Sequence, residues 1–125
     1  MKSGRKLLEE AFLEALPGWQ VRSTAIPLDS VRKPGAIWLY TGVRKRVELN
    51  GFSTLVDEIT VWVLSAADPS KAEDDLDKLL LEVMEVLETL PSFNWESAER
   101  GVLGEKYDGW KLTVTCFYKI NDEGN

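Results

Sequence analysis

Hydrophobic residues in positions 4–16 recur at the spacing of one helix face, with three glutamates on the opposite face. Pro17 and Gly18 follow directly, and this pair ends a helix. The pattern therefore predicts an amphipathic helix over 4–16. A short strand is expected over 19–24, followed by a proline-bounded loop over 25–36.

A long β-hairpin is predicted next, because the pair Asn50-Gly51 is the strongest short-range signal for a two-residue hairpin turn. If these two residues form the turn, every cross-strand pair can be counted back from it. The predicted pairs are Leu49 with Phe52, Arg46 with Leu55, Arg44 with Asp57, Tyr40 with Val61 and Trp38 with Val63. A bulge at Gly42 would shift the pairs beyond it by one residue.

This hairpin is apolar on both faces near its base and charged on both faces towards its turn. Arg44, Arg46 and Asp57 are predicted on one face of the outer part, and Lys45, Glu48 and Glu58 are predicted on the other. The profile fits a sheet that is covered on both sides at its base, with a tip that reaches into solvent or a partner.

A second helix is predicted after residue 70. Ser70 and Glu73 have the spacing of a capping box, in which the two side chains bond the first free amides of the helix. A stripe of hydrophobic residues follows at helical spacing and consists of Ala72, Leu76, Leu79, Leu80, Val83, Leu87 and Leu90. Leu81 points away from this stripe, among acids. A single exposed leucine is normal, so Leu81 is only a hint of an interface.

Two more strands are predicted in the last third of the sequence. Residues 93–100 form the first, a glycine-bearing loop spans 101–109, and residues 110–120 alternate between apolar and polar side chains. Residues 121–125 are expected to fray. The order of elements predicts one α+β domain over 1–125, with two helices packed on a mostly antiparallel sheet.

The amino-acid composition argues against several classes of function. The chain of 125 residues carries 21 acids and 15 bases, a net charge of −6 that argues against a nucleic-acid binder held by a basic surface. Hydrophobic residues make up 44%, but no stretch is apolar enough to span a bilayer. A single cysteine excludes an internal disulfide. Five tryptophans favour a protein that assembles, because aromatic residues are enriched in interface cores.

Catalytic patterns are missing from the sequence. The chain has no histidine, which removes the commonest general base and the commonest metal ligand. Cys116 falls on the apolar side of the last strand and is expected to be a core residue. The acids at 73, 74, 75 and 77 lack the spacing of a calcium loop and instead complement a helix dipole. We therefore expect no enzyme, metal or cofactor.

The run Arg44-Lys45-Arg46 is the best remaining candidate for function. One interpretation is a solvated stretch with cross-strand ion pairs, each worth only ~0.2–1 kcal/mol. Charged edge strands also protect against aggregation. The other interpretation is that these cations meet a partner.

Taken whole, the layout resembles the tail terminator proteins of long-tailed bacteriophages, also called tail completion or minor tail proteins. The resemblance covers nearly the full chain. It is carried by the N-terminal helix and by the stretches "IPLDSVRKPGAIWLY", "DEITVWVLSA", "DPSKAEDDLDKLLLEVMEVL" and "DGWKLTVTCFYKI". The cationic run is not a motif that can be assigned to this family.

The resemblance implies a structural virion protein, assembled in the host cytoplasm, that forms a ring of six on the head-proximal end of the tail tube. Such a ring stops tube growth and offers a surface for the head-tail connector proteins, while DNA passes through the channel without specific binding. No membrane partner is expected. Because a head-to-tail ring needs two different patches on each subunit, the hairpin is hypothesised to meet acids of a neighbouring copy or of the tube. The hypothesised interface comprises Arg44, Lys45, Arg46, Glu48, Asp57, Glu58, Asp74, Leu81, Glu82 and Glu85.

Two other classes stay open. Another head-tail connector or neck protein would share the ring but contact the portal side. A small α+β ligand-binding module is also possible, because a pocket is invisible in a sequence.

Overall fold

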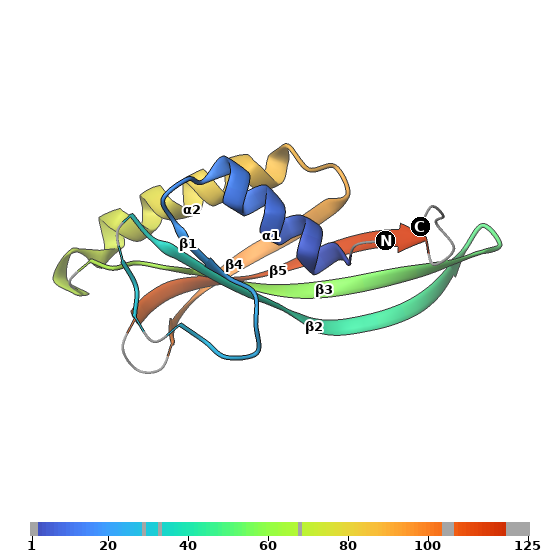
Figure 1. Cartoon of the computed structure of the whole chain (residues 1–125), viewed down its shortest axis with the longest axis horizontal. Helices are drawn as coiled ribbons and strands as arrows, with labels where there is room; N and C mark the ends of the chain where they lie inside the picture. The colour runs from blue at the N-terminus through green and yellow to red at the C-terminus, as the bar shows by residue number, and fades with distance from the viewer. Residues whose placement is uncertain (1–2, 29, 33, 68, 104–106, 120–125) are drawn as a thin grey trace.

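The computed structural model describes residues 3–28, 30–32, 34–67, 69–103 and 107–119, and it shows one sheet with both helices on the same face (Figure 1). The helices are α1, Gly4–Ala15, and α2, Ala72–Glu88, and a 3-10 turn, Pro69–Lys71, precedes α2. The strands are β1 Gln20–Arg22, β2 Ala36–Leu49, β3 Phe52–Leu64, β4 Phe93–Leu103 and β5 Tyr107–Lys119.

The five strands lie in the order β1-β2-β3-β5-β4. Only β1 runs parallel to its neighbour, and the other three pairings are antiparallel. The predicted α+β fold, with two helices on a mostly antiparallel sheet, is therefore confirmed. None of the helices in the described part of the chain is long and apolar enough to cross a membrane.

The hairpin of β2 and β3, here called the ribbon, turns at Asn50-Gly51 as predicted. Both residues adopt positive φ, 52° and 81°, which is what the favoured two-residue turn requires. The predicted pairs near the turn are confirmed, namely Leu49 with Phe52, Arg46 with Leu55 and Arg44 with Asp57.

The ribbon register shifts between Thr41 and Val43, at the possible bulge noted for Gly42. Trp38 therefore pairs with Trp62 and Tyr40 with Thr60, so the pairs counted without a bulge, Tyr40 with Val61 and Trp38 with Val63, were wrong. Because side chains alternate between faces, this one-residue shift moves Ile37 and Leu39 onto the same face as Val61 and Val63.

The core lies between the helices and this face of the sheet, here called the helix face. Leu8 and Phe12 of α1 and Leu79 and Val83 of α2 are almost completely buried there. The sheet contributes a fully buried layer from three strands: Ile37, Leu39, Ile59, Val61, Val63, Leu112 and Val114. Val86 joins the predicted stripe of α2, whereas Leu80 and Leu90 are only half-buried.

The opposite face of the sheet, here called the open face, carries no helix of the described chain (Figure 1). Part of its base is covered by the β1–β2 loop, where the Trp38 indole Nε1 donates a 2.8 Å hydrogen bond to the Thr24 carbonyl. The prediction that both faces are covered at the base therefore holds in part: Ala36, Trp38 and Leu64 of this face are buried, whereas Tyr40 and Trp62 are only half-buried.

Two local predictions were wrong. Helix α2 begins at Ala72 with Lys71 at its N-cap and no capping bond from the Lys71 side chain, so the capping box of Ser70 and Glu73 is out of register with the helix. The Glu73 carboxylate instead pairs with Arg100 of β4. The loop predicted over 101–109 is shorter, because β4 continues to Leu103 and β5 starts at Tyr107. The tail predicted to fray, 121–125, lies outside the described residues.

Candidate functional site

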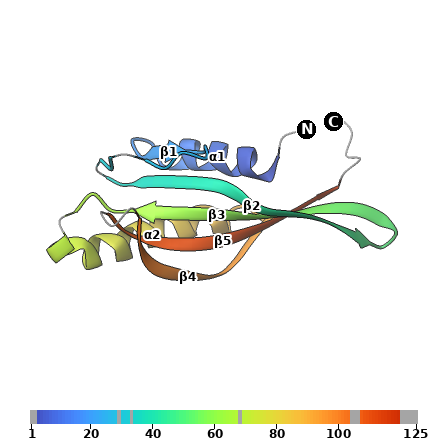
Figure 2. The ribbon, with the colours of Figure 1, turned by 90° about the horizontal axis from the view of Figure 1, so that it is seen from below.

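The outer part of the ribbon, residues 43–58 and here called the distal ribbon, extends beyond both helices (Figures 1 and 2). All three cations of the run 44–46 lie on its β2 arm and are exposed. Arg44 and Arg46 share the helix face with Asp57, and Lys45 shares the open face with Glu58, as the register near the turn requires.

Arg44 is a structural residue. Its Nε donates to Asp57 Oδ1 at 2.7 Å and its Nη2 donates to Asp57 Oδ2 at 3.0 Å, which is a bidentate pair. The Asp57 side chain is 0% exposed, although Arg44 is about half exposed. Because Asp57 is so buried, loss of Arg44 would leave a carboxylate without its main counter-charge.

The other two cations make weaker contacts. Lys45 Nζ lies 3.4 Å from Glu58 Oε2, and both groups are partly exposed. Arg46 Nη2 donates to the Ser53 hydroxyl at 2.7 Å and forms no ion pair with any described residue. Glu48 is exposed opposite Ser53 and lies on the helix face with Arg44 and Arg46, so its predicted place on the face of Lys45 and Glu58 was wrong. Arg46 is therefore the cation of the run that is most available to a partner.

The distal ribbon also carries apolar side chains that the sequence reasoning missed. Phe52 is 59% exposed, Val43 is 46% exposed, and Phe117 of the adjacent β5 is 45% exposed. All three lie on the open face, because Val43 pairs with Glu58 and Phe117 lies level with Lys45 and Val56. The signal was the register set by the turn, which places Val43 and Val47 on one face with Phe52 and Val56.

A groove runs along the outward side of α2. It has a volume of about 550 Å³ and is lined by Lys78, Leu81, Glu82, Met84, Glu85 and Glu88. Leu81 is 60% exposed. We call this surface the α2 groove: Leu81 and Met84 provide apolar contact, and three glutamates provide negative charge.

The α2 groove brings together three of the four interface residues predicted on this helix, Leu81, Glu82 and Glu85. Asp74 lies apart from them, in a separate hollow with Ser70, Lys71 and Asp75. Met84 and Glu88 were missed, although both fall one helical turn or less from predicted residues and share their side of the helix.

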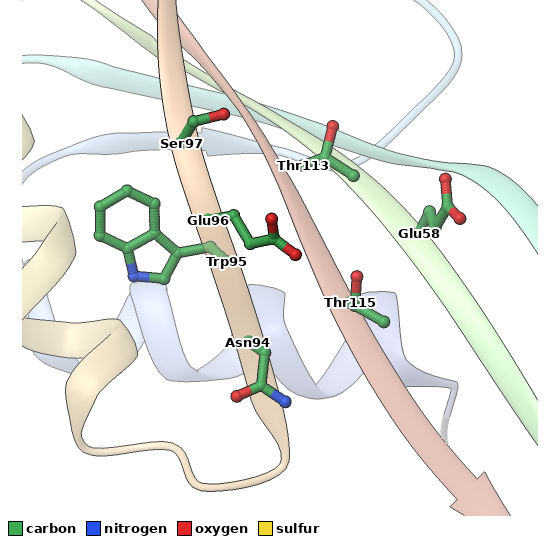
Figure 3. Close-up of a pocket in the computed structure, with 7 residues that line it drawn as sticks. All are labelled: Glu58, Asn94, Trp95, Glu96, Ser97, Thr113 and Thr115. Atoms are coloured by element: carbon green, nitrogen blue, oxygen red, sulfur yellow. The ribbon is translucent and has the colours of Figure 1, made fainter.

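A second, polar hollow lies where β4 bulges between Trp95 and Ala98 (Figure 3). It holds about 310 Å³ and is lined by Glu58, Asn94, Trp95, Glu96, Ser97, Thr113 and Thr115. Figure 3 shows the Glu96 carboxylate extending from β4 towards the threonines of β5, while the Trp95 ring points away from them. Two carboxylates beside two hydroxyls form a site that accepts hydrogen bonds, and Lys45 already contacts one of the carboxylates, Glu58.

Cys116 lies on the helix face of β5, opposite Asp57. Burial raises the pKa of its thiol from 9.0 to about 11, and the negative charge of Asp57 adds to the effect. A thiol in this setting stays protonated and is a poor nucleophile at neutral pH. Across the described residues, no three His, Cys, Asp or Glu side chains gather to form a metal site.

Comparison with models of protein families and with curated proteins found no match to this chain in either case. The function is therefore argued from the chemistry of the distal ribbon and the α2 groove.

Proposed function

We propose that this protein is a non-enzymatic ring subunit of the tail terminator type, which caps the head-proximal end of a phage tail tube and ends its growth. In this proposal the ring also presents the surface on which the head-tail connector proteins dock. One observation carries the proposal: a single chain has two separate, chemically complementary surfaces, the distal ribbon and the α2 groove.

A head-to-tail ring requires such a pair of different surfaces, because each subunit uses one patch on one side and the other patch on the other side. The distal ribbon offers Arg46 and the exposed Phe52. The α2 groove offers three glutamates beside Leu81 and Met84. We place the distal ribbon of one copy in the α2 groove of the next.

Charge and apolar contact have different roles at this contact. Burial of Phe52 and Leu81 contributes affinity, at roughly 25 cal/mol for each Å² of apolar surface removed from water. Arg46 sets register and speeds association more than it adds affinity. We assign Arg44 to the fold and not to this contact, because its Nε–Nη2 edge binds the buried carboxylate of Asp57.

Native mass spectrometry over a range of concentrations and at two salt strengths tests the ring. We expect a closed six-subunit species for the natural chain and its loss in Arg46→Glu, which reverses a cation without touching the buried pair. Arg32→Glu, the same change on the exposed β1–β2 loop, is the matched control and should assemble normally. A dimer as the largest species, or normal assembly of Arg46→Glu, would contradict the proposed contact.

Binding to particles tests the location. A terminator binds the ends of free tail tubes, whereas a neck protein of the portal side binds free heads. The net charge of −6 should also repel DNA phosphates, so that a genome slides through the ring. Tight DNA binding by the purified protein at physiological salt would contradict this channel role.

The polar hollow at the β4 bulge supports a second candidate function, a small-ligand-binding module. Its two carboxylates and hydroxyls suit a cationic ligand with several hydrogen-bond donors. A screen of polyamines and amino-sugar cations by thermal shift would reveal binding as a rise in Tm with ligand concentration. Glu96→Gln should abolish that rise, and Glu14→Gln on the exposed side of α1 is the control.

A further inference from the structure

We infer that copies of this chain also join edge to edge, with the outer edge of β2 in one copy pairing with the outer edge of β4 in the next and extending the sheet. The partner is a second copy of this chain, and the site is the backbone of two end strands. The inference requires only that copies assemble, and it does not depend on a role in a phage tail.

Both ends of the sheet present open backbone. Strand β1 pairs only with Ala36–Trp38, the first three residues of the 14-residue β2, so positions 39–49 have no strand on their outer side among the described residues. At the other end, β4 pairs only with β5 within the same part of the chain and spans 11 residues. The two open edges are therefore equal in length, and an unpaired edge is a template for another chain.

Strand direction favours this pairing. Strand β2 runs towards the ribbon turn, β3 runs back, β5 runs with β2, and β4 runs against it. When a second copy continues the sheet without being flipped, its β2 lies antiparallel to β4 of the first copy. Antiparallel ladders have the more favourable hydrogen-bond geometry, and they continue the alternation already present in the sheet.

Charge selects unlike edges over like edges. The β2 edge carries Lys45 on the open face, and β4 carries Glu99 on the same face, opposite Lys111 of β5. Glu96 and Glu99 are exposed and form no ion pair with a described residue. Pairing β2 with β2 would bring cations together, and pairing β4 with β4 would bring glutamates together, which is unfavourable across strands.

This pattern differs from a simple guard against aggregation. A guard works best when both edges carry the same sign, because every pairing is then repelled. Here the two edges have opposite signs, so the two symmetric dimers are disfavoured and the head-to-tail arrangement remains. The short β1 limits the pairing to the distal part of β2.

Hydrogen exchange in the assembled and dilute protein is the first test. We expect alternate amides of 39–49 and of 93–103 to exchange more slowly in the assembled form, by on the order of tenfold or more. The amides of β3 and β5, which are already paired on both sides, should change little. Assembly without protection at these two edges overturns the inference while leaving the ring proposal intact, and a monomer at all concentrations overturns both.

A charge-swap experiment is the second test, and it compares each of two variants with their mixture. Lys45→Glu and Glu99→Lys should each weaken self-assembly, since each makes the two edges alike in sign on the open face. An equal mixture of the two variants should assemble again as alternating subunits, which native mass spectrometry identifies by mass. Glu14→Lys on the exposed side of α1 is the control and should neither weaken assembly nor rescue Lys45→Glu. Absence of rescue in the mixture, with both variants folded by circular dichroism, counts against edge pairing.

Discussion

The base of the sheet and the distal ribbon belong to the same strands but are stabilised in different ways. At the base, α1 and α2 bury one face, and side chains such as Ile59 and Val61 are completely inaccessible to solvent. Towards the turn of the distal ribbon, no helix of the described chain covers either face (Figure 2). The strands there carry cross-strand ion pairs and exposed apolar side chains, although Thr54, Val56 and Asp57 are buried. The base therefore resembles an ordinary core, and the distal ribbon resembles half of an interface.

This difference indicates where stability and assembly reside. Burial at the base provides most of the folding free energy, because hydrophobic contacts outweigh exposed ion pairs. The distal ribbon contributes little to folding, so its residues are free to serve a partner. Variants at the base should unfold the chain, and most variants in the distal ribbon should change assembly alone.

The largest effect is expected from a change at the base. Phe12→Ala should lower the free energy of unfolding by about 3–5 kcal/mol, because the side chain of Phe12 on α1 is fully buried in the core. Leu13→Ala removes a neighbouring side chain that is half exposed, and its effect should stay within ~0.5 kcal/mol. Urea unfolding measures both values. Similar urea midpoints for the two variants would show that the two faces of α1 do not differ in burial.

A smaller effect is expected at the buried ion pair of the distal ribbon. Arg44→Ala should lower the free energy of unfolding by about 1–3 kcal/mol, since it leaves the buried Asp57 carboxylate without its bidentate partner. Arg46→Ala should change it by less than ~0.5 kcal/mol. Equal effects of the two variants would show that the ion pair adds nothing to folding. On this basis we propose that Arg44 serves the fold, while Lys45 and Arg46 remain the cations proposed for a partner.

A change in the ribbon turn should have a smaller and more local effect. Gly51 has a φ of 81° and open space where a Cβ would lie, so Gly51→Ala adds only backbone strain, about 1–2 kcal/mol. Asn50→Gly should leave stability within ~0.5 kcal/mol, because glycine adopts positive φ without strain. Hydrogen exchange should show that the loss of stability is confined to residues 43–58. Faster exchange at the base as well would mean that the two regions fold as one unit.

The smallest effect at neutral pH is expected from Cys116. The pKa of the thiol is raised to about 11 in the fold, so the unfolded chain ionises first as the pH rises above 9.0. The contribution of the thiol is complete below pH 9.0 and is lost between 9.0 and about 11. The free energy of unfolding should therefore fall more steeply over this interval in the natural chain than in Cys116→Ala. Identical slopes for the two proteins would show that the pKa of the Cys116 thiol is not raised in the folded chain.

Local patterns predicted much of this fold. Helical spacing identified α1 and α2, the Asn50-Gly51 pair placed the ribbon turn, and alternation identified β5. The register near the turn was also predicted, because a two-residue turn leaves no freedom in pairing. The bulge at Gly42 was noted as an alternative, but only the packed sheet shows that it occurs.

The candidate site was predicted less completely. Leu81, Glu82 and Glu85 were identified and share one groove, whereas Asp74 lies elsewhere. Arg44 was grouped with Lys45 and Arg46, although it pairs with a buried carboxylate, whereas Lys45 pairs with the partly exposed Glu58 and Arg46 bonds the Ser53 hydroxyl. Burial depends on which residues from distant segments cover a side chain, and spacing along one strand does not contain that information.

By itself the sequence determined the two helices, the turn and the alternation of the strands, because these depend on residues within a few positions of one another. Only the tertiary structure decided which face of the sheet the helices cover, which cation serves the fold and which edges of the sheet stay open. These properties arise when segments far apart in the chain pack together. The Gly42 bulge illustrates the reason: one extra residue exchanges the faces of β2, and only the fit against α1 and α2 selects the result.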